Sequence, residues 1–380
     1  VLTPSPDRIP VDCAVAGPCG GCSLRHLDYA AELRAKQENV ADAFARIGGL
    51  DVPVLPIVGS PEVNRYRNKV QFPVGVDKSG KPCIGFYAGR THRIVPCPDC
   101  RLQPGVLNEI GNALCAFFAE KGIQPYSEET GRGLVRHIFL RRGAHSGQIM
   151  VCLVCTRAKL PSAEELCTRL KAQFAEITTI LLNVNAKNTN VILGTETHTL
   201  YGPGYIEDTL CGVPVQLGPL SFYQVNTLAA EQLYGIAAQY AQLTPDDLLL
   251  DLYCGMGTIG LSMAAHCREL IGVEIVPEAI ESAKANAARM GADVAAKSRF
   301  FCADAGQAAT RLAAEGLHPD IVMLDPPRKG CDEATLSAVV RMSPRRVVYV
   351  SCNPATAARD AAWLEQNGYH AEKVQPVDLF

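Results

Sequence analysis

The sequence predicts an α/β protein in which residues 219–380 form a doubly wound parallel sheet and residues 63–218 form a separate α+β domain. From Asn226 onward, helices and apolar strands take turns, which is typical of a parallel sheet covered by helices on both faces. Between about Val63 and Tyr205, short runs rich in Val, Ile, Phe and Thr alternate with Gly-containing turns, which predicts an antiparallel sheet.

The individual elements follow from these patterns. In the α+β region we expect helices at Gly105–Lys121 and Ser162–Phe174 and strands at Lys69–Val74, Cys83–Ala88, His137–Arg141, Gln148–Val154, Thr179–Asn185 and Thr189–Leu193. In the C-terminal region we expect parallel strands at Leu248–Tyr253, Glu269–Glu274, Ser298–Cys302, Asp320–Leu324 and Arg346–Val350.

The N-terminal part differs in composition from the two regions that follow it. Residues 1–30 are rich in Cys and Gly and cannot pack alone, so we assign them to the central domain. Residues 31–62 are expected to pack on the C-terminal domain, with a helix over Asp28–Arg46 that Gly48-Gly49 ends. The absence of an initial Met and the apolar end at Phe380 predict a piece of a longer gene product.

The composition is that of a folded globular protein. Hydrophobic residues make up 48% and charged residues 20% of the 380 residues, which excludes a disordered chain. No apolar run reaches the roughly eighteen residues that a transmembrane helix needs, and no secretory signal is present. We therefore expect a cytoplasmic protein without membrane contact, and a monomer. The sixteen cysteines are expected to be reduced, some of them serving as ligands or nucleophiles.

Charge is unevenly distributed along the chain. The whole chain carries a net charge of -3, whereas Pro61–His145 holds thirteen Lys/Arg against seven Asp/Glu, a local net charge of +6. A basic segment in an acidic chain suits contact with a polyanion such as RNA. A solvated face of mixed charge explains the same pattern equally well.

The first parallel strand runs into a glycine-rich turn that is typical of nucleotide-binding sheets. Gly255 and Gly257 allow a tight turn and the close approach of a ligand. Gly260 allows the next helix to pack closely on the sheet. Glu274 ends the next strand, where a carboxylate can accept both hydroxyls of a ribose, and Asp304 follows the third strand near a potential adenine edge. NAD binding is one alternative; a plain tight turn with a surface Glu is another.

The loop after the fourth strand favours one cofactor. Asp325-Pro326-Pro327-Arg328 stands at the carboxyl edge of the sheet, where open α/β sheets bind ligands. The two prolines remove N–H groups, so that carbonyls and a carboxylate face the cleft. A dehydrogenase has no obvious use for such a loop, whereas methyltransferases that act on bases commonly place one beside the methyl donor. This favours S-adenosylmethionine (SAM).

The fifth strand delivers Ser351-Cys352-Asn353-Pro354 to the same edge, one strand from Asp325. An isolated cysteine is usually an inert core residue, but a thiolate here can add to carbon 6 of a pyrimidine and make carbon 5 nucleophilic enough to accept a methyl group. Enzymes that methylate cytosine in RNA usually carry a Cys in the fourth-strand loop as well; this loop has none, which favours uracil.

Three clustered cysteines near the N-terminus predict a metal site. Cys13, Cys19 and Cys22 supply three thiolates within ten residues, and Cys97 or Cys100 could supply a fourth. Four thiolates suit zinc or an iron–sulfur cluster, and spacing alone does not choose between them. Free thiols without a metal are the remaining alternative.

Over nearly its whole length the chain resembles the RNA 5-methyluridine (uracil-C5) methyltransferases of the RumA/RlmD and TrmA type. The resemblance rests on ordered motifs: Cys-Gly-Gly-Cys at 19–22 with His26, Leu27 and Tyr29, Tyr66-Arg67-Asn68-Lys69, Arg136-His137, Ser221–Asn226, the Cys-Gly-x-Gly turn, Asp325–Arg328 and Ser351–Pro354.

The resemblance implies a class I SAM-dependent methyltransferase fold with an iron–sulfur site in the central domain. It implies a [4Fe–4S] cluster on Cys13, Cys19, Cys22 and Cys100, with Cys97 a bystander. It further implies that Cys352 is the nucleophile, that Phe222 stacks on the flipped base with Arg136 also on the substrate side, and that SAM is held by Gln224, Tyr253, Gly255, Gly257, Thr258, Glu274, Asp304 and Asp325. Because tRNA-type members lack the cluster, it favours 23S ribosomal RNA as the substrate.

The chain departs from the family pattern in three places. Val1–Cys13 looks like only the exit of the family's N-terminal RNA-gripping TRAM barrel, and the family's general base, a Glu, is expected beyond Phe380. Thr258 stands where the family usually has Asn, and Asp304 where an Asn can occur. The alternatives are a tRNA uracil-C5 or RNA cytosine-C5 methyltransferase and, more remotely, a non-catalytic iron–sulfur RNA-binding protein.

Overall fold

The computed structural model describes residues 3–187 and 189–380, which divide into two compact units. The first unit holds the residues up to Ala31 together with Glu62–Asp208 and Gln216–Thr227. The second holds Glu32–Pro61, Thr209–Val215 and Leu228–Phe380. In neither unit does the described part of the chain contain a helix long and apolar enough to cross a membrane.

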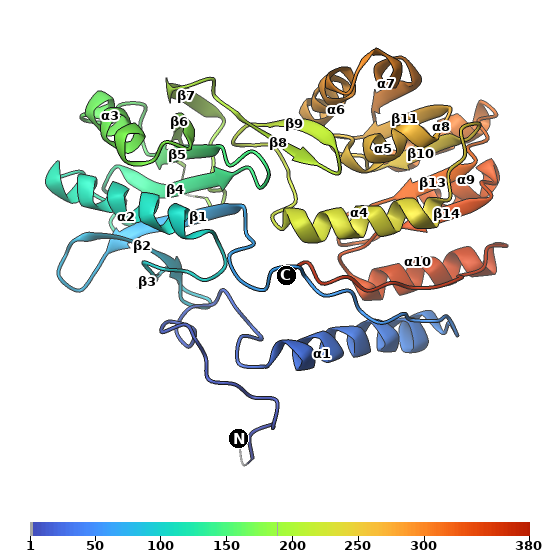
Figure 1. Ribbon diagram of the computed structural model, residues 1–380, viewed down its shortest axis with the longest axis horizontal. Helices are drawn as coiled ribbons and strands as arrows, with labels where there is room; N and C mark the ends of the chain where they lie inside the picture. The colour runs from blue at the N-terminus through green and yellow to red at the C-terminus, as the bar shows by residue number, and fades with distance from the viewer. Residues whose placement is uncertain (1–2, 188) are drawn as a thin grey trace. The chain divides into compact units, whose positions relative to one another are not determined.

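The first unit is built on a seven-stranded sheet with the strand order β3-β2-β1-β4-β5-β6-β7. Its strands are β1 (Lys69–Val76), β2 (Pro82–Tyr87), β3 (Ile94–Pro96), β4 (Val135–Arg142), β5 (Ile149–Cys155), β6 (Ile177–Val184) and β7 (Glu196–Tyr201). Helices α2 (Gly105–Glu120) and α3 (Ala163–Gln173) bury their apolar residues in one core with the sheet (Figure 1).

The strand pairing differs from the expected antiparallel sheet at one place. All neighbouring strands are antiparallel except β5 and β6, which run parallel because α3 carries the chain back across the sheet between them. A strand–helix–strand crossover of this kind requires parallel strands.

The strand expected at Thr189–Leu193 is wrong, although its residues have high strand propensity. The stretch is irregular, and the edge strand is instead β7. Asn185 donates hydrogen bonds from Nδ2 to the carbonyl oxygens of Val191 and Ile192, over 2.6 and 3.0 Å. Side-chain bonds of this kind satisfy the backbone locally and compete with strand pairing.

The second unit contains a five-stranded, wholly parallel sheet in the order β12-β11-β10-β13-β14, which confirms the doubly wound prediction. Its strands are β10 (Leu248–Leu252), β11 (Glu269–Glu274), β12 (Ser298–Cys302), β13 (Ile321–Leu324) and β14 (Arg346–Tyr349). Its helices are α4 (Thr227–Ala241), α5 (Thr258–Met263), α6 (Pro277–Arg289), α7 (Ala292–Lys297), α8 (Ala305–Ala314), α9 (Glu333–Met342) and α10 (Pro354–Gln366). The order reverses between β10 and β13, so the loops after these two strands flank the ligand position of such sheets.

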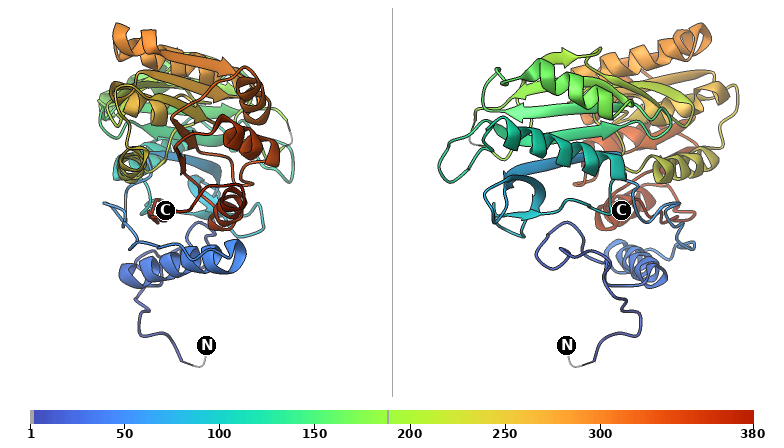
Figure 2. Two further views of the ribbon diagram at one scale, coloured as in Figure 1. Left: turned by 90° about the vertical axis from the view of Figure 1, so that its right-hand side faces the viewer. Right: turned by 60° about the vertical axis from the view of Figure 1, so that its left-hand side comes forward.

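The N-terminal helical segment packs on α10. Helix α1 (Tyr29–Asp42) continues into a π-helical turn, Ala43–Gly48, and Figures 1 and 2 show this segment beside α10. Ala43 and Phe44 share a buried cluster with Ala358 of α10. The chain after the turn pairs with the C-terminal stretch through two parallel bridges, Val54 with Val374 and Val58 with Val377. A hairpin of β8 (Ile206–Leu210) and β9 (Val213–Leu217) completes the elements.

Candidate active site

The glycine turn lies between β10 and α5, as its sequence predicted. Gly255 and Gly257 have positive φ values of 55° and 79°, a backbone conformation that glycine adopts without strain. Gly260 lies against the sheet, because a Cβ atom there would stand 2.8 Å from both Asp251 Oδ2 and Leu270 Cδ1. The absence of a side chain at Gly260 therefore lets α5 pack closely on β10 and β11.

Glu274 closes the turn at the end of β11. Its Oε2 atom accepts a hydrogen bond from the Gly255 N–H at 3.1 Å, and its Oε1 atom accepts from the N–H groups of Ile275 and Val276 at 2.8 and 3.0 Å. The carboxylate is thereby held at the carboxyl edge of the sheet, beside the glycine turn, where the sequence placed a ribose acceptor.

Two carboxyl groups lie at this edge, that of the buried Asp251 and that of the half-buried Asp325. Asp251 accepts a hydrogen bond from the Gly260 N–H, but its Oδ1 has no partner among the described residues, and burial raises its pKa to about 8. Burial also raises the pKa of Asp325, the first residue after β13, to about 7. Within the described chain, Asp325 has neither an ion pair nor a side-chain hydrogen bond, so its carboxyl is available to a ligand.

The other cofactor residues predicted in the second unit follow strands of the same sheet. Tyr253 follows β10 with a φ of 65°, and its hydroxyl lies 3.4 Å from Thr335 Oγ1. Thr258 begins α5 and is buried. Asp304 is the N-cap of α8, where its carboxylate accepts the Gln307 N–H at 3.1 Å, so one of its oxygens is already used within the chain.

Cys352 is exposed and lies on the loop between β14 and α10. The neighbouring strand holds the start of this loop, because the Val350 N–H donates to the Leu324 carbonyl oxygen at 2.8 Å. Asp325 follows Leu324 directly, so the carboxyl and the thiol emerge from adjacent strands. Asn353 caps α10 by accepting the Ala355 N–H at 3.1 Å, which fixes the loop just after the thiol.

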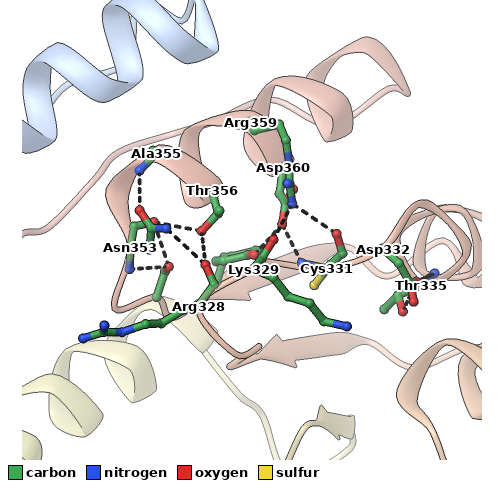
Figure 3. A network of polar contacts seen from close by, with 12 residues as sticks. Arg328, Lys329, Cys331, Asp332, Thr335, Asn353, Ala355, Thr356, Arg359 and Asp360 are labelled. Atoms are coloured by element: carbon green, nitrogen blue, oxygen red, sulfur yellow. Dashed lines mark hydrogen bonds and ion pairs between the residues drawn. The ribbon is translucent and has the colours of Figure 1, made fainter.

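A polar network joins the two loops, and the sequence analysis missed it (Figure 3). Asn353 Nδ2 donates to the Arg328 carbonyl oxygen at 3.1 Å, so the residue after Cys352 holds the loop that begins at Asp325. Buried Asp360 of α10 accepts the Cys331 N–H at 2.8 Å and the Tyr349 hydroxyl at 2.6 Å. The sequence could have indicated this role. Asp360 lies four residues before Leu364 and therefore on the same, apolar face of the helix, where a buried carboxylate needs a partner.

In the first unit, the segment that carries Phe222 and Gln224 is held by Arg141 of β4 and by Asn68, the residue before β1. Phe222 is 76% exposed, a high value for an aromatic ring. Arg141, on β4 and almost completely buried, donates from its two terminal nitrogens to the carbonyl oxygens of Gly218 and Ser221, each at 2.7 Å. Asn68 donates from Nδ2 to the Gln224 carbonyl oxygen at 2.7 Å. The segment thus presents an aromatic ring from a rigid support.

Arg136 is buried, and its guanidinium is engaged within the first unit. It donates to Glu128 at 2.8 Å and to the carbonyl oxygens of Asn185 and Lys187 at 3.1 and 2.6 Å. The Tyr126 ring lies 4.9 Å from its guanidinium carbon. These contacts hold the turn after β6, and a role of Arg136 in substrate binding stays a prediction.

The predicted cluster cysteines line a single, mostly apolar cavity of the first unit. Cys97 and the apolar side chains of Val15, Ala16, Phe86 and Leu102 also line this cavity. The four predicted ligands in its wall are Cys13, Cys19, Cys22 and Cys100. A hydrogen bond from the Cys97 thiol lowers the pKa of Cys100 below its usual range. Among the described residues, no three His, Cys, Asp or Glu side chains converge closely enough to hold one metal ion.

Comparison with known proteins places this geometry in a family. A family model described as tRNA (uracil-5-)-methyltransferase matches residues 146–380. An uncharacterized RNA methyltransferase of Clostridium tetani is 42% identical over 380 residues, covering the whole chain and 82% of the relative. One of Halalkalibacterium halodurans is 43% identical, with the same coverage.

Among solved structures, the chain is similar to the Pyrococcus abyssi tRNA (uracil-54, C5)-methyltransferase in complex with S-adenosyl-L-homocysteine. The TM-score is 0.77 at 26% identity, and the match covers 96% of this chain and 83% of that one. This confirms the class I SAM-dependent methyltransferase fold with its Rossmann-like sheet. The chain therefore belongs to the RNA (uracil-5-)-methyltransferase family, as its motifs predicted.

Proposed function

We propose that this protein methylates carbon 5 of a uridine in 23S ribosomal RNA through a covalent bond between Cys352 and carbon 6 of the base. The observation that carries the proposal is the exposed Cys352 thiol on the loop after β14, next to the loop that starts with Asp325 after the adjacent strand β13. The thiol reaches solvent, as attack on a large substrate requires, while the half-buried carboxyl of Asp325 makes no ion pair within the described chain.

The chemistry follows from the poor nucleophilicity of carbon 5 in uracil. The Cys352 thiolate adds to carbon 6, and the electron pair of the 5,6 double bond moves toward carbon 5 and the carbonyl at carbon 4. Carbon 5 then accepts the methyl group. A base removes the proton from carbon 5, the double bond re-forms, and the thiolate leaves carbon 6. The nucleophile is thus regenerated.

SAM supplies the methyl group, on a sulfonium carbon that readily accepts an electron pair. The residues proposed to hold it fit its charges. Asp325 offers a half-buried carboxyl to a cation, and the exposed Ile275-Val276 pair after Glu274 offers an apolar surface for the adenine. The glycine turn, Tyr253, Thr258, Glu274 and Asp304 would bind the rest of the nucleoside. A role of Gln224 in SAM binding stays a prediction from the family resemblance.

We further propose that the four cysteines of the cavity bind a [4Fe–4S] cluster. The cluster takes one thiolate per iron, so its ligands stand further apart than those of a single ion. Four cysteines that line one cavity supply the set of four thiolates that such a cluster takes. The apolar walls of that cavity would shield the cluster from water. Because tRNA-type members of the family lack the cluster, a cluster in this protein would favour ribosomal RNA over tRNA as the substrate.

The direct test of the proposal uses Cys352→Ala and 23S RNA from a strain that lacks the gene. We expect wild-type protein to transfer labelled methyl groups from SAM to this RNA, nucleoside digestion to give 5-methyluridine, and the variant to transfer none. Cys83→Ser, a half-buried cysteine on β2, is the matched control and should retain activity.

A second measurement examines the covalent step itself. RNA containing 5-fluorouridine has no removable proton at carbon 5, so wild-type protein should form a trapped complex whose peptide crosslink maps to Cys352. Full methyl transfer by Cys352→Ala would refute the mechanism. A product containing 5-methylcytosine, or labelling confined to tRNA, would refute the substrate assignment and leave the nucleophile in place.

A further inference from the structure

The loop after Pro326-Pro327 presents two positive charges that are not neutralised by an ion pair within the described chain. Arg328 and Lys329 are exposed, and neither side chain makes a hydrogen bond or an ion pair within residues 3–187 and 189–380. Figure 3 shows both side chains extending away from the polar network, with their charged ends clear of the other labelled residues. Only their backbone carbonyls take part in the network.

The backbone of the same two residues is held by α10. The Arg328 carbonyl oxygen accepts from Asn353 Nδ2 at 3.1 Å and from Thr356 Oγ1 at 3.3 Å. The Lys329 carbonyl oxygen accepts from Arg359 Nη2 at 3.0 Å. A solvated pair of basic residues on a surface loop needs no such anchoring, so a purely solvent-facing role leaves these contacts unexplained.

The residue that follows the basic pair shows how tightly the loop is packed. Gly330 has a φ of 79°, and a Cβ atom there would stand 2.5 Å from Arg359 Nη2 and 2.6 Å from Asp360 Oδ2. Cys331 N–H then donates to Asp360 at 2.8 Å. The loop is thus held on α10 from Arg328 to Cys331, and only the two cationic side chains remain free to bind a partner.

The acidic groups around the loop are already engaged. Asp360 accepts from Cys331, Tyr349 and the guanidinium of Arg359. Asp332 caps α9 by accepting the Thr335 N–H at 2.8 Å and the Thr335 hydroxyl at 2.7 Å, which lowers the pKa of its carboxyl. The positive charge of Arg328 and Lys329 is therefore available to an anion from outside the chain.

We propose that Arg328 and Lys329 form a phosphate clamp that grips the RNA backbone beside the nucleotide attacked by Cys352. This inference rests on the proposed function and assigns part of its substrate contact. Asn353 joins the clamp to the nucleophile, because it follows Cys352 directly and holds the Arg328 carbonyl. The phosphates that flank a base bound to Cys352 would then lie within the reach of one arginine side chain.

The clamp would position the RNA without reading its sequence. Contacts to phosphate fix register and orientation, whereas base edges carry the sequence information. Because the loop backbone is already ordered, closing the clamp costs only the side-chain freedom of two residues. Its effect should therefore appear in the affinity for RNA and in its salt dependence.

The test compares wild-type protein, Arg328→Ala, Lys329→Ala and the double variant in binding to poly(U) and to 23S RNA over a range of salt concentrations. Each lost phosphate contact should lower the slope of log K against log [salt] by about 0.7 for single-stranded RNA, so the double variant should lose about 1.4. The KM for RNA should rise. Arg328→Lys should keep most of the slope, since a point charge still neutralises phosphate.

Arg341→Ala is the matched control, because Arg341 is an exposed arginine on α9 without an ion pair in the described chain. Unchanged salt slopes in the double variant, with wild-type protein methylating RNA normally, would overturn the clamp and leave the proposed function intact. A weaker affinity for SAM with an unchanged slope would assign the pair to the cofactor's carboxylate and equally overturn it. Failure of wild-type protein to methylate any RNA would instead refute the proposed function.

Discussion

Asn68 and Gln224 lie 156 positions apart and are joined by a hydrogen bond of 2.7 Å from the Asn68 side chain to the Gln224 backbone. The Asn68 N–H also donates to the Val225 carbonyl oxygen at 2.8 Å, and its Nδ2 donates to Thr227 Oγ1 at 2.9 Å. The motif Tyr66–Lys69, whose role the sequence did not explain, thus holds the segment that carries Phe222 and Gln224.

Asn68→Ala should weaken both stability and SAM binding. Removing the buried amide leaves the Gln224 carbonyl and the Thr227 hydroxyl without their partner, which costs about 1–3 kcal/mol of the free energy of unfolding. If Gln224 binds SAM, affinity for SAM should fall as well. Urea unfolding and calorimetric titration with SAM measure the two effects. Asn367→Ala, which removes an exposed amide that donates to the Trp363 carbonyl, is the control and should change neither much.

Arg141→Lys should distinguish the effect of Phe222 on RNA binding from the effect of Gln224 on SAM binding. The guanidinium donates to two carbonyl oxygens, Gly218 and Ser221, and a single ammonium group cannot reproduce this fork. Burial lowers the pKa of Arg141 to about 10, so the group still carries its charge at neutral pH.

We expect Arg141→Lys to raise the KM for RNA several-fold because Phe222 loses its support, while the affinity for SAM changes little. Steady-state methyl transfer and SAM titration report the two quantities. Equal losses in both would show that Arg141 stabilises the unit in general and has no separate effect on the presentation of Phe222.

Much of the fold could be predicted from the sequence because its parallel strands are short, apolar and separated by helices. Ile321–Leu324, for example, is buried at every position and leads into a Pro-Pro loop that ends it clearly. The edge strand of the first unit was misplaced for the opposite reason. Glu196–Tyr201 is polar and mostly exposed, whereas the β-branched run before it is held by Asn185. The position of this edge strand is therefore set by its pairing with β6 and not by local strand propensity.

The candidate site was predictable only where chemistry leaves a local signal. The turn Gly255–Gly257 and the loop at Cys352 follow strands directly, so sequence order alone places them at one edge. Asp360 and Asn68 act on partners far away in the chain, and only a folded chain shows which carbonyls they hold. The anchoring of the Arg328 loop was therefore invisible in the sequence.

The cysteine cavity makes a prediction that distinguishes two neighbouring thiols. Protein purified without oxygen should be brown, and Cys100→Ser should lose the colour and the iron, whereas Cys97→Ser should keep both. Cys100 is the proposed fourth ligand, whereas Cys97, which is buried and lines the same cavity, is the proposed bystander. Visible absorption and iron analysis are the measurements.

Cys83→Ser, a cysteine of the same unit outside the cavity wall, serves as the control for this pair. Colour retained in Cys100→Ser and lost in Cys97→Ser would reverse the assignment of the ligand. Colourless wild-type protein that contains zinc would refute the cluster.

Asp325→Asn should change the pH dependence of stability and of SAM binding. Burial raises the pKa of Asp325 to about 7, whereas the carboxyl titrates at about 3.9 in an unfolded chain. Between these two values the folded state binds more protons than the unfolded state, so the contribution of Asp325 to the free energy of unfolding falls as the pH rises. The variant should therefore gain about 2–3 kcal/mol relative to wild type between pH 5 and pH 8. Urea unfolding at both pH values measures this gain.

SAM binding should show the opposite trend in wild-type protein. The charged form of Asp325 attracts a cation, so affinity for SAM should rise from pH 5.5 to pH 8, and Asp325→Asn should abolish most of that rise. Asp332→Asn is the control, because the Thr335 contacts lower the pKa of Asp332 and leave it charged over the whole range. Its stability difference from wild type should stay constant between pH 5 and pH 8. If the stability difference between Asp325→Asn and wild type also stays constant between pH 5 and pH 8, Asp325 is already ionised in the free protein over this range. That result would contradict the raised pKa of Asp325.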